Sequence, residues 1–198
     1  MGLKAVFSKK RPVYTAGLLY TLTALIVVLS AWAEDLHRFG LDLTISRYVG
    51  LRPWTAVLYM VVAAVMVTLV FIYIRSSKMP RVKQGLYMLV FACVFGCAIC
   101  PFNYAWSAVL SDMHNGFAYG LMLLVTISFV WMAVRPVNRK QRIFGIAAIC
   151  YALYFIICFV IIGWEFFIST IFVWENIFIY MLLGELILEY RDNGWTLS

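Results

Sequence analysis

The chain has 198 residues, of which 65% are hydrophobic and only 13% are charged. Soluble domains are roughly half apolar and about a quarter charged, so a soluble fold of this size cannot bury so much apolar surface. The composition therefore excludes a soluble domain, a disordered chain, a nucleic-acid-binding tail and a secreted disulfide scaffold. It predicts a polytopic membrane protein, and the net charge of +7 has to be explained in that setting.

Six apolar stretches are long enough to cross a bilayer, which needs about 20 apolar residues per helix. They occupy most of the chain, so we expect a single all-α domain over residues 1–198, a polytopic bundle of six transmembrane helices. Pro53 opens the second stretch and suits a first helical position. The expected spans are about 13–33, 53–74, 85–103, 116–134, 143–164 and 166–188.

The basic residues orient this bundle, because cytoplasmic loops carry an excess of Lys and Arg. The expected outer connections contain only Arg38, Arg47 and Arg52. All other basic residues fall in the N-terminus, the second and fourth connections and the C-terminal tail. Both termini are therefore expected in the cytoplasm, and the positive charge is a topology signal. These residues are Lys4, Lys9, Lys10, Arg11, Arg75, Lys78, Arg81, Lys83, Arg135, Arg139, Lys140, Arg142 and Arg191.

The three outer connections differ in length and polarity. In the first, residues 34–52, Leu41, Leu43 and Ile45 alternate with polar residues, which predicts a short extended segment. The second, residues 101–115, is polar, and the last is a tight turn at residues 163–165. Aromatic residues in these connections are expected to form an interfacial belt. They are Tyr48, Trp54, Tyr104, Trp106 and Trp164.

Both histidines, His37 and His114, fall on the outer side together with several carboxylates. Their spacing matches no metal-binding motif, so we expect neither a metal site nor a cofactor. The five cysteines all lie inside expected spans, which gives no indication of a disulfide framework. His114, with Asp112 and Asn103, is expected at a polar outer mouth of the bundle.

One ionisable residue is predicted near the middle of the membrane. Glu175 follows Glu165, in the expected turn, by about 15 Å of helix rise. Charged groups at that depth usually face a cavity or a partner. With no cation expected there, Glu175 should carry a proton, and Trp174, Asn176 and Asn103 complete the candidate ligand or proton site. Glu175 is equally open to a functional and a purely structural role, whereas Glu185 and Glu189 are expected near the inner interface.

Three short stretches resemble the six-helix superfamily that includes the damage-regulated autophagy modulators (DRAM), their Frag and Sfk relatives and bacterial membrane proteins of unknown function. The segment 45–50, Ile-Ser-Arg-Tyr-Val-Gly, is similar to an I-S-D-x-G type segment, with Arg47 where an aspartate is common. The segment 112–118 resembles the family's histidine followed by small residues. Trp174-Glu175 is similar to a Trp and Glu pair in the last helix, in reversed order. The resemblance implies a six-helix fold and a lipid- or membrane-associated role without a settled chemistry.

Three functions are consistent with these features. The first is a non-enzymatic module that binds membrane lipids, a membrane-protein partner or a second copy, using the polar outer mouth, with Ser46 and Arg47, and the buried Glu175. The second is a small proton-coupled transporter with Glu175 as the titrating group. The third is an enzyme acting on lipids of the outer leaflet, with His114 as general base and Asp112 or Glu34 as its partner. A non-enzymatic role is favoured, and a nucleic-acid partner is not expected.

Overall fold

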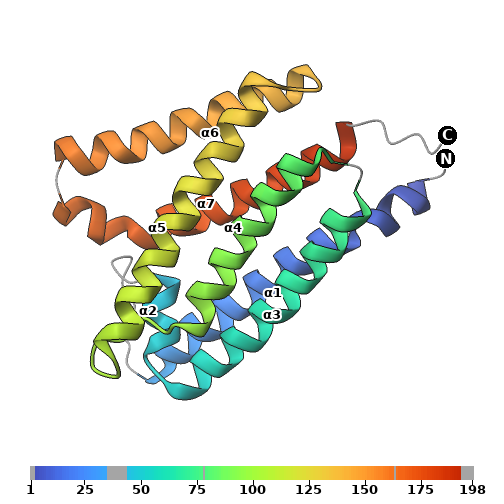
Figure 1. Ribbon diagram of the computed structural model, residues 1–198. Coiled ribbons are helices and arrows are strands. Elements are labelled where there is room, and N and C mark those ends of the chain that lie inside the picture. Colours follow the sequence, from blue (N-terminus) through green and yellow to red (C-terminus); the bar gives the residue numbers. More distant parts are fainter. Residues whose placement is uncertain (1–2, 35–43, 78, 163, 193–198) are drawn as a thin grey trace.

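The computed structural model describes residues 3–34, 44–77, 79–162 and 164–192. These residues form seven α-helices and one π-helical turn, and there is no β-strand among them (Figure 1). The elements are α1 (Leu3–Glu34), α2 (Ile45–Gly50), α3 (Pro53–Ser76), α4 (Arg81–Ile99), α5 (Ala108–Val134), α6 (Arg139–Ile157), η2 (Cys158–Ile162) and α7 (Trp164–Asp192).

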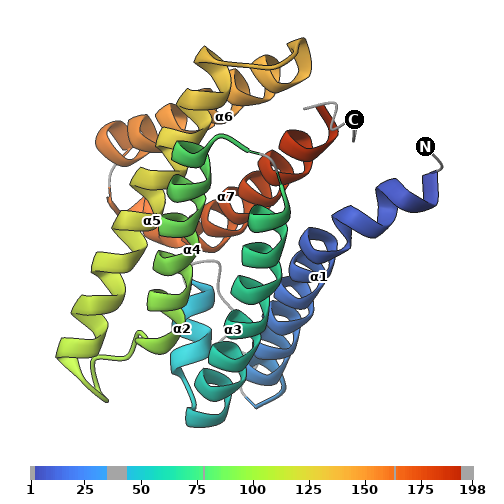
Figure 2. The ribbon, with the colours of Figure 1, turned by 45° about the vertical axis from the view of Figure 1, so that its right-hand side comes forward.

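The six long helices form a closed ring. Along the ring α1 packs on α3, α3 on α4, α4 on α5, α5 on α6, α6 on α7, and α7 returns to α1. The shared core takes buried residues from all six, among them Tyr20 of α1, Val70 of α3, Phe129 of α5 and Leu186 of α7. The short helix α2 contacts α1 and α3, and it lies between the ends of the long helices in both views (Figures 1 and 2).

Five helices, α1 and α3 to α6, are long and apolar enough to cross a membrane. They coincide with five of the six expected spans, and α7 covers the sixth. Their outward faces carry large apolar side chains, such as Leu18 on α1 and Val65 on α3, which are about half exposed. Continuous apolar surface of this extent requires an apolar solvent. The chain is therefore a helical, multi-pass membrane protein.

The start of α5 differs from the expected boundary. We expected residues 101–115 to form a connection, but α4 ends at Ile99 and α5 already begins at Ala108. Pro101 disfavours helical geometry at the residue before it, which ends α4. The Ser107 side chain then accepts a hydrogen bond from Leu110 N, which caps the new helix. As a result Asp112 and His114 belong to the first turns of a helix.

The first outer connection also differs from the expected extended segment. Ile45, expected within that segment, instead begins α2, and the Thr44 side chain caps this helix by accepting from Arg47 N at 3.0 Å. Residues 41–43 lie outside the described part of the chain. Tyr48, expected as an interfacial anchor, is buried, whereas Trp54, Tyr104 and Trp106 are exposed.

The fifth span is divided between two helical geometries. The α-helix α6 ends at Ile157, and the π-helical turn η2 continues the chain to Ile162 before α7 begins at Trp164. Helix α6 also approaches α5 closely at Gly145, where an added Cβ would lie 2.6 Å from Ala133 N. A glycine at this position therefore allows the two backbones to meet, as small residues do in membrane bundles.

Candidate functional site

The half of the bundle in which α3 begins and α4 ends holds α2 as an inserted segment. Helix α2 runs out toward the end where α3 begins, so its first residue is directed into the bundle (Figure 2). Ile45, Tyr48 and Val49 are each at most 3% exposed. Buried helix N-termini need acceptors for their free N–H groups, because no water reaches them.

Glu175 of α7 supplies these acceptors. Its Oε2 accepts a hydrogen bond from Ile45 N at 2.8 Å, and its Oε1 accepts one from the Ser46 hydroxyl at 3.4 Å. A negative charge at a helix N-terminus is also favoured by the helix dipole. The structure thus brings the segment 45–50 to Glu175, and it gives this acid a contact that holds α2.

The neighbours of Glu175 point to other helices. The Trp174 ring packs against Tyr151 of α6, with ring centroids 5.3 Å apart, and its carbonyl accepts from the Tyr151 hydroxyl at 3.2 Å. Asn176 Oδ1 accepts from the Tyr20 hydroxyl of α1 at 3.1 Å. Consecutive helical residues point about 100° apart, so residues 174–176 anchor three different elements. A ligand site shared by these residues stays a prediction.

Asn103, expected in the same site, lies at the opposite end of α2. Its amide donates to Gly50 O at 2.7 Å, and the Gly50 backbone packs so closely on Phe102 that an added Cβ would lie 2.5 Å from the Phe102 carbonyl oxygen. Arg47 is exposed, with its guanidinium 5.8 Å from the Phe102 ring centroid. Asn103 and Arg47 therefore fasten α2 to the connection between α4 and α5.

His114 is buried and closes the end of α4. Its Nδ1 lies 2.9 Å from Cys97 O and 2.7 Å from Cys100 O. Both neighbours are acceptors, so Nδ1 carries the proton. Carbonyls at a helix C-terminus have no partner within the helix. His114 satisfies two of them and joins α5 to α4.

Asp112 does not converge with His114. It is exposed on α5, and its Oδ1 accepts from the Tyr104 hydroxyl at 2.9 Å. This hydrogen bond to a carboxylate raises the pKa of Tyr104. The side chain of Glu34 and the whole of His37 lie outside the described part of the structure. Within that part, the general base and acid partner expected for an enzyme are directed to different neighbours.

A second polar cluster lies near the opposite end of the bundle. Lys83 of α4 forms a buried ion pair with Glu189 of α7. Glu185 is 0% exposed, with Oε2 2.7 Å from the Ser128 hydroxyl of α5, and the Tyr87 hydroxyl of α4 faces the Glu185 carboxylate. We call Lys83, Tyr87, Ser128, Glu185 and Glu189 the inner cluster.

The inner cluster is not predicted by the sequence. Hydropathy favours Lys83 in a connection and both glutamates near the interface, whereas all three side chains are buried. One signal was available. Lys83 and Tyr87 are four residues apart, as are Glu185 and Glu189, so each pair lies on one helix face. Facing polar pairs on two apolar helices indicate a contact between those helices.

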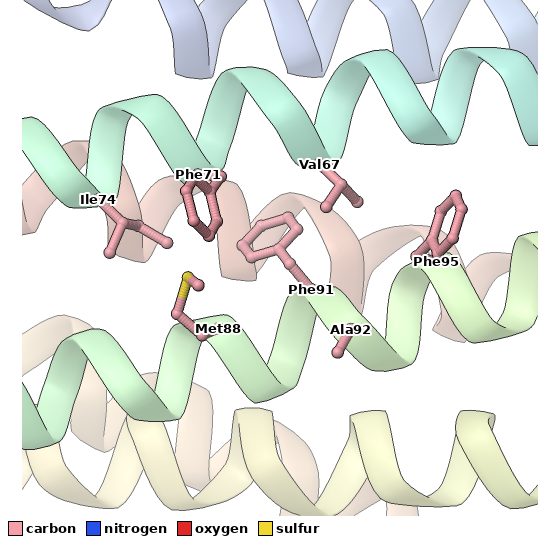
Figure 3. Close-up of a pocket in the computed structure, with 7 residues that line it drawn as sticks. All are labelled: Val67, Phe71, Ile74, Met88, Phe91, Ala92 and Phe95. Carbon is pink, nitrogen blue, oxygen red and sulfur yellow. The ribbon is translucent and has the colours of Figure 1, made fainter.

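An apolar groove runs along the surface between α3 and α4. Its volume is about 230 Å³, and Figure 3 shows the side chains of both helices around it. Arg75, one residue after Ile74 at one end of the groove, has its guanidinium 5.4 Å from the Phe71 ring centroid. The lining residues are Val67, Phe71, Ile74, Met88, Phe91, Ala92 and Phe95.

Among the described residues, no group of three or more His, Cys, Asp or Glu side chains is arranged to hold a metal ion. All five cysteines are free thiols. The Cys97 thiol makes a long contact with His114 O at 3.9 Å, which ties α4 to α5.

Comparison of the chain with protein-family models, with curated proteins and with solved structures finds no match. The resemblance to the DRAM, Frag and Sfk superfamily therefore stays a prediction.

Proposed function

We propose that this protein is a non-enzymatic, lipid-binding module of the membrane with six spans and both termini in the cytoplasm. The start of α1, the end of α7 and the connections α3–α4 and α5–α6 all lie at one end of the bundle (Figures 1 and 2). That end carries exposed basic residues such as Arg75, Arg81 and Arg142. An excess of basic residues marks the cytoplasmic side, which supports this orientation and α7 as the sixth span.

The observation that carries the lipid proposal is the groove between α3 and α4. It is lined only by apolar side chains and opens on the outward face of the bundle, where Ala92 is exposed. Its volume is below the roughly 300–1,000 Å³ of small-molecule pockets. A groove of this size and chemistry suits one acyl chain.

Charge selects the kind of lipid. The chain from Pro53 to Ser111, which includes both helices of the groove, contains no acidic residue, so the formal charges on these two helices are all positive. Arg75 follows Ile74 at one end of the groove, and Arg81 is the first residue of α4. Both side chains are exposed. A basic residue near the membrane surface attracts anionic headgroups by about 1 kcal/mol. We infer an anionic phospholipid of the cytoplasmic leaflet, with its chain in the groove and its headgroup near Arg75.

The transporter and enzyme alternatives receive less support. Both Glu175 oxygens hold the start of α2, so this carboxylate serves as a structural acceptor. His114 Nδ1 faces backbone carbonyls while Asp112 faces Tyr104. Neither arrangement leaves a pair of groups aligned for proton transfer.

The test fills the groove without removing packing. The variant Ala92→Phe places a ring in it, and Ala147→Phe on the exposed face of α6 is the matched control. Each protein is reconstituted in vesicles of phosphatidylglycerol and phosphatidylcholine and then extracted in mild detergent. Native mass spectrometry measures how much phospholipid stays bound to it. We expect the wild type and Ala147→Phe to retain phospholipid and Ala92→Phe to lose it. Equal retention by Ala92→Phe and the wild type would contradict the proposal.

The headgroup is tested separately. Arg75→Gln should retain phospholipid but lose about fivefold of its preference for phosphatidylglycerol, since one basic residue contributes about 1 kcal/mol. Arg142→Gln, at an exposed position on α6, is the control. If both variants change the preference equally, the attraction belongs to the whole basic surface and the assignment to Arg75 is wrong.

A further inference from the structure

The inner cluster contains two buried polar atoms that lack hydrogen-bond partners among the described residues. They are Tyr87 Oη and Glu185 Oε1, and both side chains are 0% exposed. Leaving a polar group without a hydrogen-bond partner in a buried site is destabilising. The two groups face each other across α4 and α7. The cluster therefore contains an incomplete hydrogen-bond network around one carboxyl group.

The charges of the cluster do not balance when every group is ionised. Lys83 provides one positive charge and pairs with Glu189, which leaves Glu185 as a second, uncompensated carboxylate. Helix α3 adds only the neutral Tyr73, whose hydroxyl donates to Leu186 O at 2.8 Å. From α6 the apolar Phe144 ring packs beside Gly184. An uncompensated buried charge is costly, and such groups usually become neutral.

The hydrogens can be counted at Ser128. Its hydroxyl oxygen lies 2.8 Å from Val125 O and 2.7 Å from Glu185 Oε2. A serine hydroxyl has one hydrogen to donate but can also accept. If that hydrogen goes to Val125 O, the short contact with Glu185 needs a hydrogen on the carboxyl group. A proton on Oε2 then donates to Ser128 Oγ, and Oε1 is free to accept from Tyr87.

We propose that Glu185 is a proton-binding site, with the proton on Oε2 shared with Ser128 and with Oε1 as the acceptor for Tyr87. The reaction is the addition of one proton to one carboxylate. It makes the inner cluster neutral, since Lys83 and Glu189 cancel, and it gives each hydroxyl in the network one acceptor. The site is separate from the groove between α3 and α4.

Infrared spectroscopy detects this proton directly, through the carbonyl stretch of a protonated carboxylic acid. The purified protein in detergent at neutral pH should show such a band, shifted in D₂O, that Glu185→Gln removes. Glu175→Gln is the matched control, because it replaces another acid of α7 and must leave the Glu185 band in place. If no band sensitive to Glu185→Gln appears in a folded protein, Glu185 is ionised and the proposal is wrong.

A second variant keeps the test valid should Glu185→Gln fail to fold. Ser128→Ala removes the acceptor of the proton, so the Glu185 band should remain and shift in frequency. An unchanged band in Ser128→Ala would overturn the assignment of the proton to Oε2.

Stability provides an independent readout. If the folded chain holds a proton that the unfolded chain releases near neutral pH, stability falls as the pH rises. This fall should be weaker in Glu185→Gln, whose amide is neutral at every pH and reproduces the donor and acceptor of the acid. Stabilisation by Na⁺ over choline that Glu185→Gln abolishes, without a carboxylic acid band, would indicate a bound cation and overturn the proposal.

Discussion

Glu175 Oε2 accepts the backbone N–H of Ile45 at 2.8 Å and so joins the last long helix to the start of α2. It is one of several polar contacts made by α7. Further along that helix the Leu186 carbonyl meets Tyr73, Glu185 meets Ser128 and Glu189 meets Lys83. Together with the contacts of Trp174 and Asn176, α7 makes a polar contact with each of α1 to α6. The last helix is therefore linked to every other α-helix by at least one polar contact.

The first prediction concerns Glu175. Replacing it with Ala leaves Ile45 N–H without its acceptor, so stability should fall by about 1–3 kcal/mol. Glu175→Gln keeps one acceptor oxygen and replaces the other with an amide nitrogen, which should cost about 0.5–1.5 kcal/mol. Unfolding in detergent measures both changes. The control is Asp112→Asn, which replaces an exposed acid on α5. If Glu175→Ala is as stable as this control, the contact between Glu175 and Ile45 does not contribute to stability and the prediction is wrong.

The second prediction concerns the ion pair of Lys83 and Glu189. Glu189→Gln leaves a buried ammonium group uncompensated and should destabilise the fold by about 3–5 kcal/mol. The double variant Lys83→Met with Glu189→Leu should recover most of this loss, because an apolar pair often replaces a buried ion pair without cost. Unfolding of the wild type, Lys83→Met, Glu189→Leu and the double variant forms a double-mutant cycle. Additive effects would show that the two residues do not interact.

The third prediction compares two glycines. In Gly145→Ala the new Cβ would lie 2.6 Å from Ala133 N and 3.0 Å from Phe129 O, which are backbone atoms of α5. The helices must separate, at a cost of about 1–3 kcal/mol. Gly116 has no atom within 4 Å of an added Cβ, so Gly116→Ala should stabilise α5 by about 0.5–1 kcal/mol. Thermal unfolding in one detergent distinguishes the pair, and the same sign of change for both would contradict the close approach of α5 and α6.

The fourth prediction concerns His114. Its removal in His114→Ala leaves Cys97 O and Cys100 O without their donor, so the end of α4 should open more often. Hydrogen exchange of the amides in residues 97–100, at the end of α4, should therefore accelerate, with a loss of stability of about 1 kcal/mol. Asp112→Ala should leave exchange at the end of α4 unchanged because it contacts Tyr104 instead. Equal effects of the two variants would show that His114 has no special role there.

The sequence alone predicts that this protein lies in a membrane, and it predicts the positions of the main helices. Five of the expected spans coincide with helices of membrane-crossing length, since transfer of a helix into lipid depends on the sum of its own residues. Local capping was less well predicted. The Ser107 cap lengthened α5 by eight residues relative to the expected start at Gly116, which moved Asp112 and His114 from a connection into a helix.

Only the tertiary structure decided which polar residues meet. Hydropathy along the chain treats Lys83 as a charge of a connection and Glu185 as a charge near the interface, yet both are buried because α4 and α7 present these faces to the core. Hydropathy also indicates that Glu175 is a buried acid, but it does not indicate that Ile45 and Ser46 of α2 donate hydrogen bonds to its oxygens. The sequence determined how much of each helix is apolar, and the packing of helices decided which groups share a buried site. The free energy of a contact depends on two residues that are distant in the sequence. Hydropathy summed over consecutive residues therefore cannot predict it.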